Sequence, residues 1–375
     1  MDIYSYMLAK GKEYRNFHPL KAKNIYEKLS KYIPKKSKNI QIIGTNGKGS
    51  TGRFLALLLS DFKVLHFTSP HVFKFNERFY KNGKIISDEE LNDAHVFLQK
   101  FDFIKDASYF EYATFLAHKL AHDVDYMILE CGVGGERDST SVLERDLCLF
   151  TIVDYDHQDL LGNSIEEIAT TKLNAMINPS IIGIQNNIVV SDIAKKIAKD
   201  REISIHFVES ICDSVHSYIN KHKLATFLSQ NLQLALKAME VLDIKYDLDS
   251  IPKLDLPYRF QKIKDNIIVD VGHNVSAARA IKNELLNTRF NLIYNSYYQK
   301  DIEEILRILK DNIIKVEIID IKDNDRIVKR DILVNILNRL EIPYCDFKAI
   351  DNDCFYLVFG SFSVVENFLK ILGDS

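Results

Sequence analysis

The stretch NIQIIGTNGKGSTGRFLALLLS, residues 39–60, decides the fold, because an apolar run, a glycine-rich turn and a helical segment follow one another in it. Residues 39–44 have the composition of a buried β-strand, and residues 51–60 that of a helix. Glycines at such a junction let backbone N–H groups converge on phosphate oxygens, and the helix amino terminus adds partial positive charge. A lysine in the turn can reach the β- and γ-phosphates, and a hydroxyl after it can ligate Mg²⁺. The stretch therefore predicts a nucleotide-binding loop formed by Gly44, Thr45, Asn46, Gly47, Lys48, Gly49 and Ser50.

The loop departs from the general pattern G-x-x-x-x-G-K-[ST], because Gly49 separates Lys48 from Ser50. The alternative interpretation is a structural turn that contains glycines by coincidence. The position of the loop between a buried strand and a helix favours phosphate binding.

Outward from this stretch, short β-rich runs alternate with helical stretches, which favours a parallel sheet covered by helices. Further strands rich in Ile, Val or Phe are expected at residues 63–68, 126–131, 148–153 and 181–184. Two helices are expected to begin at capping boxes, one at Ser87 with Glu90 and one at Ser164 with Glu167.

Two prolines, Pro252 and Pro257, interrupt the alternation, which then restarts. Beyond them, strands are expected at 267–271, 291–294, 315–319 and 355–359, and helices at 276–286, 302–309 and 329–340. A chain of 375 residues exceeds the usual size of one hydrophobic core. We therefore predict an α/β protein with a parallel-sheet P-loop ATPase domain at residues 1–255, a linker at 256–264 and a smaller Rossmann-like α/β domain at 265–375.

The composition is that of an ordinary globular protein, with 46% hydrophobic and 27% charged residues. A formal net charge of −3 gives no general attraction to nucleic acid or to anionic lipid. The five cysteines are widely spaced and form no Cys-x-x-Cys pair, which indicates a reducing compartment. No run approaches the roughly 20 apolar residues of a membrane span. We expect a cytoplasmic protein without nucleic-acid or membrane partners.

A polar, aromatic and basic loop, SPHVFKFNERF at residues 69–79, follows the expected strand at 63–68. Open α/β sheets bind ligands at the carboxyl ends of their strands. Basic residues here could meet an anionic substrate and aromatic rings could stack on a flat ring system; they are Lys74, Arg78 and Lys81, and Phe73, Phe75 and Phe79. The alternative is an exposed loop fixed in place by its aromatic residues.

Glu130 lies at the carboxyl end of the expected strand at 126–131. Burying a lone charge is costly, so Glu130 is expected to face a cation or a base. Mg²⁺ is the natural partner beside nucleotide phosphates. A salt bridge to a lysine is the alternative.

A fourth strand end carries Asp156 and His157, and Lys172 follows 15 residues after His157. A lone histidine after a strand is more often a structural hydrogen-bonding group than a ligand. Here three strands would present Ser69, Glu130 and His157 to one sheet edge, which favours a site.

The expected strand at 267–271 ends in a similar turn, which contains Asp270, His273 and Asn274. Asp270 and Asn274 could bind a ribose or a base, and Arg259 in the linker could reach a phosphate as a bidentate donor.

Together these segments resemble the folylpolyglutamate synthase and dihydrofolate synthase family, which belongs to the Mur ligase superfamily. The resemblance runs from about Ile40 to the carboxyl end. The most diagnostic segments are residues 44–50, 69–79, 110–111, 130–135, 156–157, 161–162 and 168–169, together with Lys172.

The resemblance implies an ATP-dependent ligase that attaches L-glutamate to dihydropteroate or to the γ-carboxylate of a folate through an acyl phosphate. It implies ATP and two Mg²⁺ ions as cofactors, with Ser50, Ser69 and Glu130 at one ion and His157 and Lys172 at the other. Lys172 would be carbamylated, because an ammonium cannot ligate Mg²⁺. The catalytic residues would be Lys48, His157 and Lys172. The nucleotide would also contact Asn231, Arg259, Asp270 and His273, and the substrate Phe75, Asn76, Arg78 and Asp138. A monomer acting on small molecules is expected.

The sequence also departs from the family pattern. The family's Asp-Gly-Ala-His-Asn is replaced by residues 270–274, DVGHN, and a charge is reversed at Glu136. Residues 138–141 read DSTS instead of Asp-Ala-Thr-Asn, and Leu-Asn-Ala follows Lys172 where Ala-Gly-Ile is usual. These changes affect the substrate side more than the phosphate side. Two alternatives therefore stay open, a ligase acting on a UDP-sugar peptide and a catalytically impaired nucleotide-binding paralogue.

Overall fold

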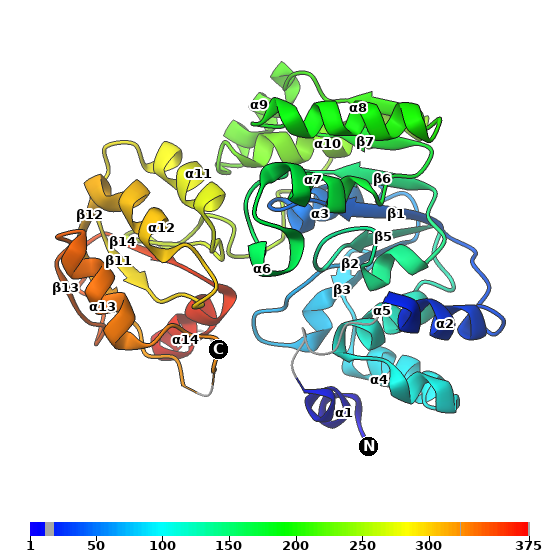
Figure 1. Cartoon of the computed structure of the whole chain (residues 1–375), viewed down its shortest axis with the longest axis horizontal. Helices are drawn as coiled ribbons and strands as arrows, with labels where there is room; N and C mark the ends of the chain where they lie inside the picture. The colour runs from blue at the N-terminus through cyan, green and yellow to red at the C-terminus, as the bar shows by residue number, and fades with distance from the viewer. Residues whose placement is uncertain (12–18, 323, 374–375) are drawn as a thin grey trace. The chain divides into compact units, whose positions relative to one another are not determined.

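The computed structural model describes residues 1–11, 19–322 and 324–373, and its ribbon is shown in Figure 1. The chain divides into two compact units. The first comprises Met1–Asp154, Leu160–Tyr218 and Ser229–Asp255, and the second comprises Tyr155–Asp159, Ile219–Leu228 and Leu256–Ser375. Two short segments that the sequence placed in the first domain, and the expected linker, thus pack with the second unit. Each unit is a sheet covered by helices, which confirms the α/β prediction.

The sheet of the first unit has eight strands among the described residues, in the order β4-β3-β2-β5-β1-β6-β7-β8. All neighbours pair in parallel except β3, which is antiparallel to both β2 and β4. The strands are β1 (Lys38–Ile43), β2 (Val64–Phe67), β3 (Phe79–Lys81), β4 (Lys84–Ile85), β5 (Tyr126–Glu130), β6 (Leu147–Phe150), β7 (Ser180–Ile182) and β8 (Ile205–Phe207). Because β1, β2, β5 and β6 are parallel, the loops that follow them emerge at one edge of the sheet.

The described helices of the first unit are α1 (Ile3–Lys10), α2 (Pro19–Leu29), α3 (Lys48–Leu58), α4 (Asp88–Leu98), α5 (Tyr109–Leu120), α7 (Ile165–Leu173), α8 (Ile188–Asp200) and α10 (Leu228–Val241). Three 3₁₀ turns are η1 (Phe75–Arg78), η2 (Asp102–Asp106) and η3 (Ser139–Val142). Two further helices are α6 (Gln158–Leu161) and α9 (Asp213–Lys221). The chain passes between the units within α6 and within α9, and again between Leu228 and Ser229 at the start of α10.

The predicted helix starts are confirmed. The Ser87 hydroxyl accepts the Glu90 N–H before α4. Ser164 and Glu167 form both halves of a capping box before α7. The apolar faces of α4 and α5 pack with β2 and β5 residues in one core, and those of α7 and α8 pack with β1, β6 and β7 residues in another.

The sheet of the second unit has six strands among the described residues, in the order β13-β12-β11-β14-β10-β9. Only β9 is antiparallel to its neighbour. The strands are β9 (Gln261–Lys264), β10 (Ile267–Val269), β11 (Phe290–Tyr294), β12 (Ile313–Ile318), β13 (Tyr344–Asp346) and β14 (Tyr356–Phe359). The helices are α11 (Val275–Leu285), α12 (Ile302–Leu309), α13 (Arg330–Arg339) and α14 (Phe362–Leu372), with the 3₁₀ turn η4 (Lys310–Asn312). Among the described residues no helix is long and apolar enough to cross a membrane.

Candidate functional site

The predicted phosphate loop lies between β1 and α3, and two of its glycines are required by close contacts. Gly47 has φ of +84°, and a Cβ at this position would lie 2.2 Å from Asn231 Oδ1. A Cβ at Gly44, which has φ of +155°, would lie 1.9 Å from Thr151 Oγ1. Gly47 is the N-cap of α3 and caps the helix without a side-chain hydrogen bond. The N–H groups of the first turn are therefore suited to an anion.

Two lysines converge on one backbone oxygen of this loop. Lys48 Nζ donates to the carbonyl oxygens of Gly44 and Thr45 at 3.2 and 3.1 Å. Lys172 Nζ, on α7, donates to the same Gly44 oxygen at 3.0 Å. Lys172 is only 4% exposed. The structure thus brings the predicted residues Lys48 and Lys172 together at the phosphate loop.

Asn231, on α10, also lies against the phosphate loop, since its side chain closes over Gly47. Its Oδ1 lies 3.5 Å from the hydroxyl of Thr51, in the first turn of α3. This contact joins residues that are 180 positions apart in the chain. The placement is consistent with the expected contact between Asn231 and the nucleotide.

The ends of β2 and β5 meet at Glu130, which is 5% exposed. Its Oε2 accepts hydrogen bonds from the Thr68 hydroxyl and from the Ser69 N–H, the latter at 3.1 Å. Glu130 also lies opposite Ile42 in the register of β1 and β5, next to the strand that leads into the phosphate loop. A buried carboxylate held by neutral donors at this edge is suited to a cation.

The oxygen donors at this edge fit Mg²⁺, which prefers carboxylate, hydroxyl and water oxygens. They would be the Glu130 carboxylate and the hydroxyls of Ser50 and Ser69, and Ser50 is buried in the first turn of α3. Within the described ranges, no group of three or more His, Cys, Asp and Glu side chains is placed to hold a metal ion. A site here therefore depends on serine hydroxyls and on the nucleotide's own phosphates.

The loop between β2 and β3 is stabilised largely by its own polar groups. The Glu77 carboxylate accepts the N–H groups of Val72, Phe73 and Lys74 at 2.7, 3.0 and 2.7 Å. Asn76 Oδ1 accepts from the Tyr4 hydroxyl at 2.5 Å. The Asn76 amide donates to the Ile86 carbonyl and the Asp88 carboxylate at 3.2 and 2.8 Å.

Arg78 is 1% exposed and donates to His71 Nδ1 at 2.9 Å. Its guanidinium lies 5.6 Å from the Phe75 ring centroid and 5.4 Å from that of Tyr109. Burial, and then the charge of Arg78, lowers the pKa of His71 to about 3, so the imidazole is neutral. Phe75, Asn76 and Arg78 therefore build this loop, and their contact with a substrate stays a prediction.

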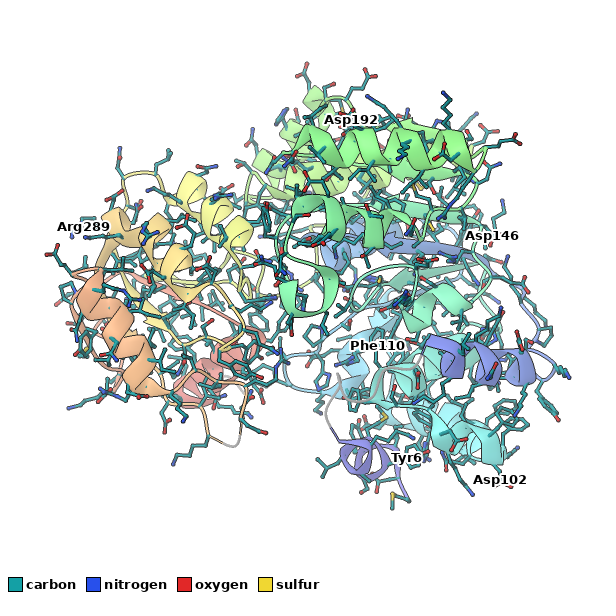
Figure 2. The ribbon with its side chains drawn as sticks, viewed as in Figure 1. Tyr6, Asp102, Phe110, Asp146, Asp192 and Arg289 are labelled. Atoms are coloured by element: carbon teal, nitrogen blue, oxygen red, sulfur yellow. The ribbon has the colours of Figure 1, made fainter. Side chains whose placement is uncertain are left out.

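Some of the basic and aromatic residues that were expected to face a substrate instead pack or form ion pairs within the protein. Lys81 forms ion pairs with Glu90 and Asp123 at 3.0 and 2.9 Å, so it belongs to the packing of β3. Phe79 is fully buried. Half-buried Phe110, labelled in Figure 2, lies beside the turn after Glu130, where a Cβ at Gly132 would approach its ring to 2.7 Å.

Asp138 organises the turn that follows Glu130. Its carboxylate accepts the N–H groups of Gly132, Val133 and Thr140 at 3.0, 3.1 and 2.9 Å, and the Thr140 hydroxyl at 2.6 Å. Burial raises the pKa of Asp138 despite these hydrogen bonds. The structure therefore gives Asp138 a role in shaping the turn, and its substrate contact stays a prediction.

His157 packs with the second unit, in a cluster centred on the buried carboxylate of Asp156. Lys300 forms an ion pair with Asp156, and the Asn274 amide donates to it at 3.1 Å. The Nε2 atoms of His273 and His157 lie 3.6 and 3.9 Å from the same carboxylate. Burial raises the pKa of Asp156, but the contact with His273 and the charge of Lys300 outweigh it and hold that pKa well below its usual range. The meeting of His157 and Lys172 at one metal ion stays a prediction, because the two residues belong to different units.

The other predicted residues of the second unit have structural partners. The Asp270 carboxylate accepts the N–H groups of Gly272 and Phe260 at 2.6 and 2.7 Å. Arg259 donates to the Pro257 carbonyl at 3.1 Å, and its guanidinium lies 5.3 Å from the Phe362 ring centroid. Their contact with a nucleotide stays a prediction.

Sequence reasoning missed Thr68 and Lys300. Thr68 precedes Ser69 at a strand end, so a search for hydroxyls beside Glu130 would have found it. Lys300 has no local signal, because Asp156 is 144 residues away in the chain.

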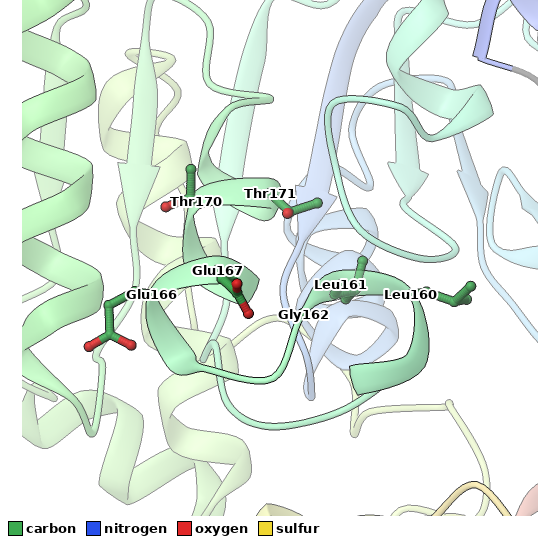
Figure 3. Close-up of a pocket in the computed structure, with 7 residues that line it drawn as sticks. All are labelled: Leu160, Leu161, Gly162, Glu166, Glu167, Thr170 and Thr171. Carbon is green, nitrogen blue, oxygen red and sulfur yellow. The ribbon is translucent and has the colours of Figure 1, made fainter.

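An open depression of about 520 Å³ lies on the first unit and is shown in Figure 3. It is lined by Leu160, Leu161, Gly162, Glu166, Glu167, Thr170 and Thr171. None of the predicted site residues lines it, so the candidate site is defined by the strand ends and not by this depression.

No protein-family model matches the sequence. Among solved structures, the chain is similar to Helicobacter pylori folylpolyglutamate synthetase, with 42% identity and a TM-score of 0.83 over 100% of this chain and 98% of the other. A bifunctional folylpolyglutamate synthase/dihydrofolate synthase from Yersinia pestis, complexed with AMPPNP and a Mn ion, has 21% identity and a TM-score of 0.83 over 100% and 98% of the two chains.

Among curated proteins, a dihydrofolate synthase/folylpolyglutamate synthase of Buchnera aphidicola is 29% identical over 361 residues, which cover 88% of this chain and 86% of the relative. The similarities extend over both units and agree with the fold and with the phosphate loop. The chain therefore belongs to the folylpolyglutamate synthase and dihydrofolate synthase family.

Proposed function

We propose that the protein is an ATP-dependent ligase that joins L-glutamate by an amide bond to dihydropteroate, to the γ-carboxylate of a folate, or to both. The observation that carries this proposal is the full-length similarity to the Helicobacter pylori enzyme at 42% identity. The phosphate loop with its two required glycines, and the carboxylate of Glu130 beside it, support the use of ATP.

The reaction has two steps. The terminal phosphoryl group moves from ATP to a carboxylate oxygen of the acceptor, which gives ADP and an acyl phosphate. The glutamate amine then attacks the acyl carbon, loses a proton and expels phosphate. Positioning and electrostatic stabilisation supply most of the catalysis, and no protein nucleophile is required.

The chain's own groups would act mainly on charge and geometry. The N–H groups of the first turn of α3 would hold phosphate oxygens, and Gly47 keeps that turn accessible. Lys48 would exchange its two carbonyl partners for the β- and γ-phosphates. Asn231 would limit the space above Gly47 and so orient the nucleotide.

We further propose that Ser50, Ser69 and Glu130 hold one Mg²⁺ and that His157 and a carbamylated Lys172 hold a second. Bound Mg²⁺ would neutralise charge that develops on the transferred phosphoryl group. Thr68 and the Ser69 N–H would orient the Glu130 carboxylate. The position of Lys172 supports this role, since its buried side-chain nitrogen lies 3.0 Å from the Gly44 carbonyl of the phosphate loop.

The acceptor is proposed to bind at the loop between β2 and β3, near the half-buried ring of Phe110. Phe75, Asn76, Arg78 and Asp138 would shape this site, and Arg259, Asp270 and His273 would contribute to the nucleotide site from the second unit. The partners are small molecules, and we propose that the protein acts as a monomer in the cytoplasm, where its five free cysteines would stay reduced.

The proposal is tested by measuring ADP release from purified protein with ATP, Mg²⁺, L-glutamate and either dihydropteroate or tetrahydrofolate. Repeated turnover with release of ADP should require both acceptor and glutamate, whereas acceptor alone should give at most one ADP per enzyme molecule. An acceptor labelled with ¹⁸O in its carboxylate should transfer one label to the released phosphate, because the acyl phosphate passes that oxygen on. Absence of turnover with both acceptors would reject the proposal, and unlabelled phosphate would reject the acyl phosphate.

A further inference from the structure

Arg53 is a buried cation in the helix that carries the phosphate loop. It is 3% exposed and lies in α3, five residues after Lys48. Its Nε donates to His66 Nδ1, in β2, at 3.4 Å. Its guanidinium lies 3.6 Å from the centroid of the Tyr80 ring, in β3. One nitrogen remains directed at the Asp255 carboxylate, 2.9 Å away.

Asp255 is the last residue of the first unit before the chain passes into the second at Leu256. Its side chain is 43% exposed, so the ion pair has one buried and one accessible member. The charge of Asp255 also reaches Tyr80, since burial first, and then this carboxylate, raises the pKa of Tyr80 to about 12. Arg53 and Tyr80 together therefore hold the Asp255 carboxylate in place.

The residue next to Arg53 contacts the same segment, residues 252–255, through Tyr218. Phe54, fully buried, packs edge-on against Tyr218 with ring centroids 6.1 Å apart. The Tyr218 hydroxyl donates to the Pro252 carbonyl at 2.6 Å. Tyr218 is itself the last residue of the first unit before the chain passes into the second at Ile219. Two consecutive residues of α3 thus hold two of the points at which the chain leaves the first unit.

We propose that Arg53 and Asp255 are positioning residues, which anchor the end of the first unit, residues 252–255, to the phosphate-loop helix so that a nucleotide bound at the loop sets the path of the chain into the second unit. The inference rests on the proposed function, because it requires a nucleotide at residues 44–50. Arg53 is about 8 Å along the helix axis from Lys48, at 1.5 Å per residue, and a helix transmits a displacement over this length nearly rigidly.

A purely structural ion pair is the competing explanation, and the geometry argues against it. Arg53 already has His66 and the Tyr80 ring as partners inside the first unit. The Asp255 carboxylate balances the buried guanidinium only in part, since it is half-exposed and partly screened by solvent. The main effect of the ion pair is to fix the position of residue 255.

The test compares the full-length protein with Asp255→Asn, Arg53→Lys and the matched control Asp61→Asn. Asp61 is an exposed aspartate shortly after α3 and lies outside the described contact. Three quantities are measured for each protein: the Kd of the ATP analogue AMPPNP, ligase turnover, and the amide hydrogen exchange of residues 248–255 with and without AMPPNP.

AMPPNP should slow exchange in residues 248–255 of the wild type and Asp61→Asn, and this effect should disappear in Asp255→Asn. The Kd should change by less than about twofold while kcat falls roughly tenfold, a split that loss of stability alone does not produce. Arg53→Lys keeps the positive charge, so it should retain part of the AMPPNP effect on exchange and part of the wild-type kcat. The inference is overturned if AMPPNP leaves wild-type exchange in this segment unchanged or if Asp255→Asn keeps the effect. Failure of the proposed function would appear separately, as an absence of ligase turnover in the wild type with either acceptor.

Discussion

The Gly44 carbonyl accepts hydrogen bonds from both Lys48 and Lys172, so two ammonium groups share one residue of the phosphate loop. Two like charges so close together repel each other, and an anion bound at the loop would offset that repulsion. Lys48 can turn to the phosphates, and addition of CO₂ to Lys172 with loss of a proton would replace its positive charge with a negative one. These two residues therefore allow separate tests of the phosphate loop and the second metal ion.

Lys48→Ala should lower kcat/KM for ATP by about 10²–10³-fold, because it removes the cation that neutralises the β- and γ-phosphates. The unfolding midpoint should stay close to that of the wild type, since the hydrogen bonds of Lys48 to described residues go to backbone carbonyls of its own loop. Steady-state kinetics and thermal unfolding check the two statements. Unchanged turnover would show that the loop is structural.

Lys172→Ala should lower kcat roughly 10–100-fold, since it removes a proposed metal ligand. Acetate or another short carboxylate should restore part of the activity by supplying the missing oxygen donor, whereas it should not rescue Lys48→Ala. Activity is measured across a series of carboxylate concentrations. A variant that no carboxylate rescues would count against the carbamate.

His118 provides a pH test that is independent of the active site. It is buried on α5, where its Nε2 bonds to the Ile33 carbonyl at 3.1 Å. Burial lowers its pKa from 6.5 to about 4, although the bond to Ile33 opposes this. The unfolded chain therefore binds a proton first as the pH falls, and stability should drop between pH 6.5 and about 4, by about 3 kcal/mol in all.

His118→Gln should flatten this part of the stability profile, because glutamine keeps a donor and does not titrate. The half-exposed His122 gives the matched variant His122→Gln, which controls for the effect of a histidine-to-glutamine change at an accessible position. Urea unfolding at several pH values provides the comparison. Equal slopes in the wild type and His118→Gln would contradict the assignment.

At the scale of elements, the turn of the phosphate loop has a left-handed backbone at Gly47 and the Asn231 side chain close beside it. The effects of these two features on stability can be measured separately. Gly47 and Gly83 have nearly equal φ values, +84° and +86°, but only Gly47 has a side chain against it. Gly83→Ala should cost only the backbone strain, roughly 1–2 kcal/mol. Gly47→Ala should add overpacking against Asn231, about 1–3 kcal/mol, and weaken nucleotide binding.

Chemical denaturation and nucleotide titration of both variants measure these effects. Equal losses of stability, with nucleotide binding intact in Gly47→Ala, would mean that Asn231 moves aside. The contact of α10 with the loop would then have little influence on the nucleotide.

Long apolar elements could be predicted from the sequence, and short ones that depend on a partner could not. The strand before Gly44 and the helix starts at Ser87 and Ser164 carry strong local signals, and the structure confirms them. In contrast, β9 has an exposed, mostly polar sequence and pairs antiparallel at the edge of its sheet. β13 spans three half-buried or exposed residues, so only its pairing with β12 makes it a strand.

At the scale of the whole molecule, the site too could be predicted where the signal is local, and could not where a residue depends on a distant partner. Residues at strand ends, such as Ser69 and Glu130, could be predicted to meet because parallel strands end at one edge, and Ser69 does bond to Glu130. The polar residues of the loop after β2 could not be placed, since Asn76 depends on Tyr4 in α1 and Arg78 on burial against Tyr109. The cluster of Asp156 with Lys300 arises from tertiary packing alone.

The residues proposed to take part in the reaction are divided between the two units. The phosphate loop, Glu130 and Lys172 belong to the first unit, whereas His157, His273 and Asp270 belong to the second. The proposed metal ligands therefore come from both units, with His157 from the second, and Asp270 and His273 are proposed to contact the nucleotide. Neither unit alone is expected to catalyse ligation.

The most direct test of the central claim is the mass of the product formed from ATP, Mg²⁺ and L-glutamate with dihydropteroate in one reaction and tetrahydrofolate in another. The account predicts that at least one acceptor gains the mass of a glutamyl residue, with one ADP released for each residue added. ATP hydrolysis without any gain of mass in either acceptor would contradict it.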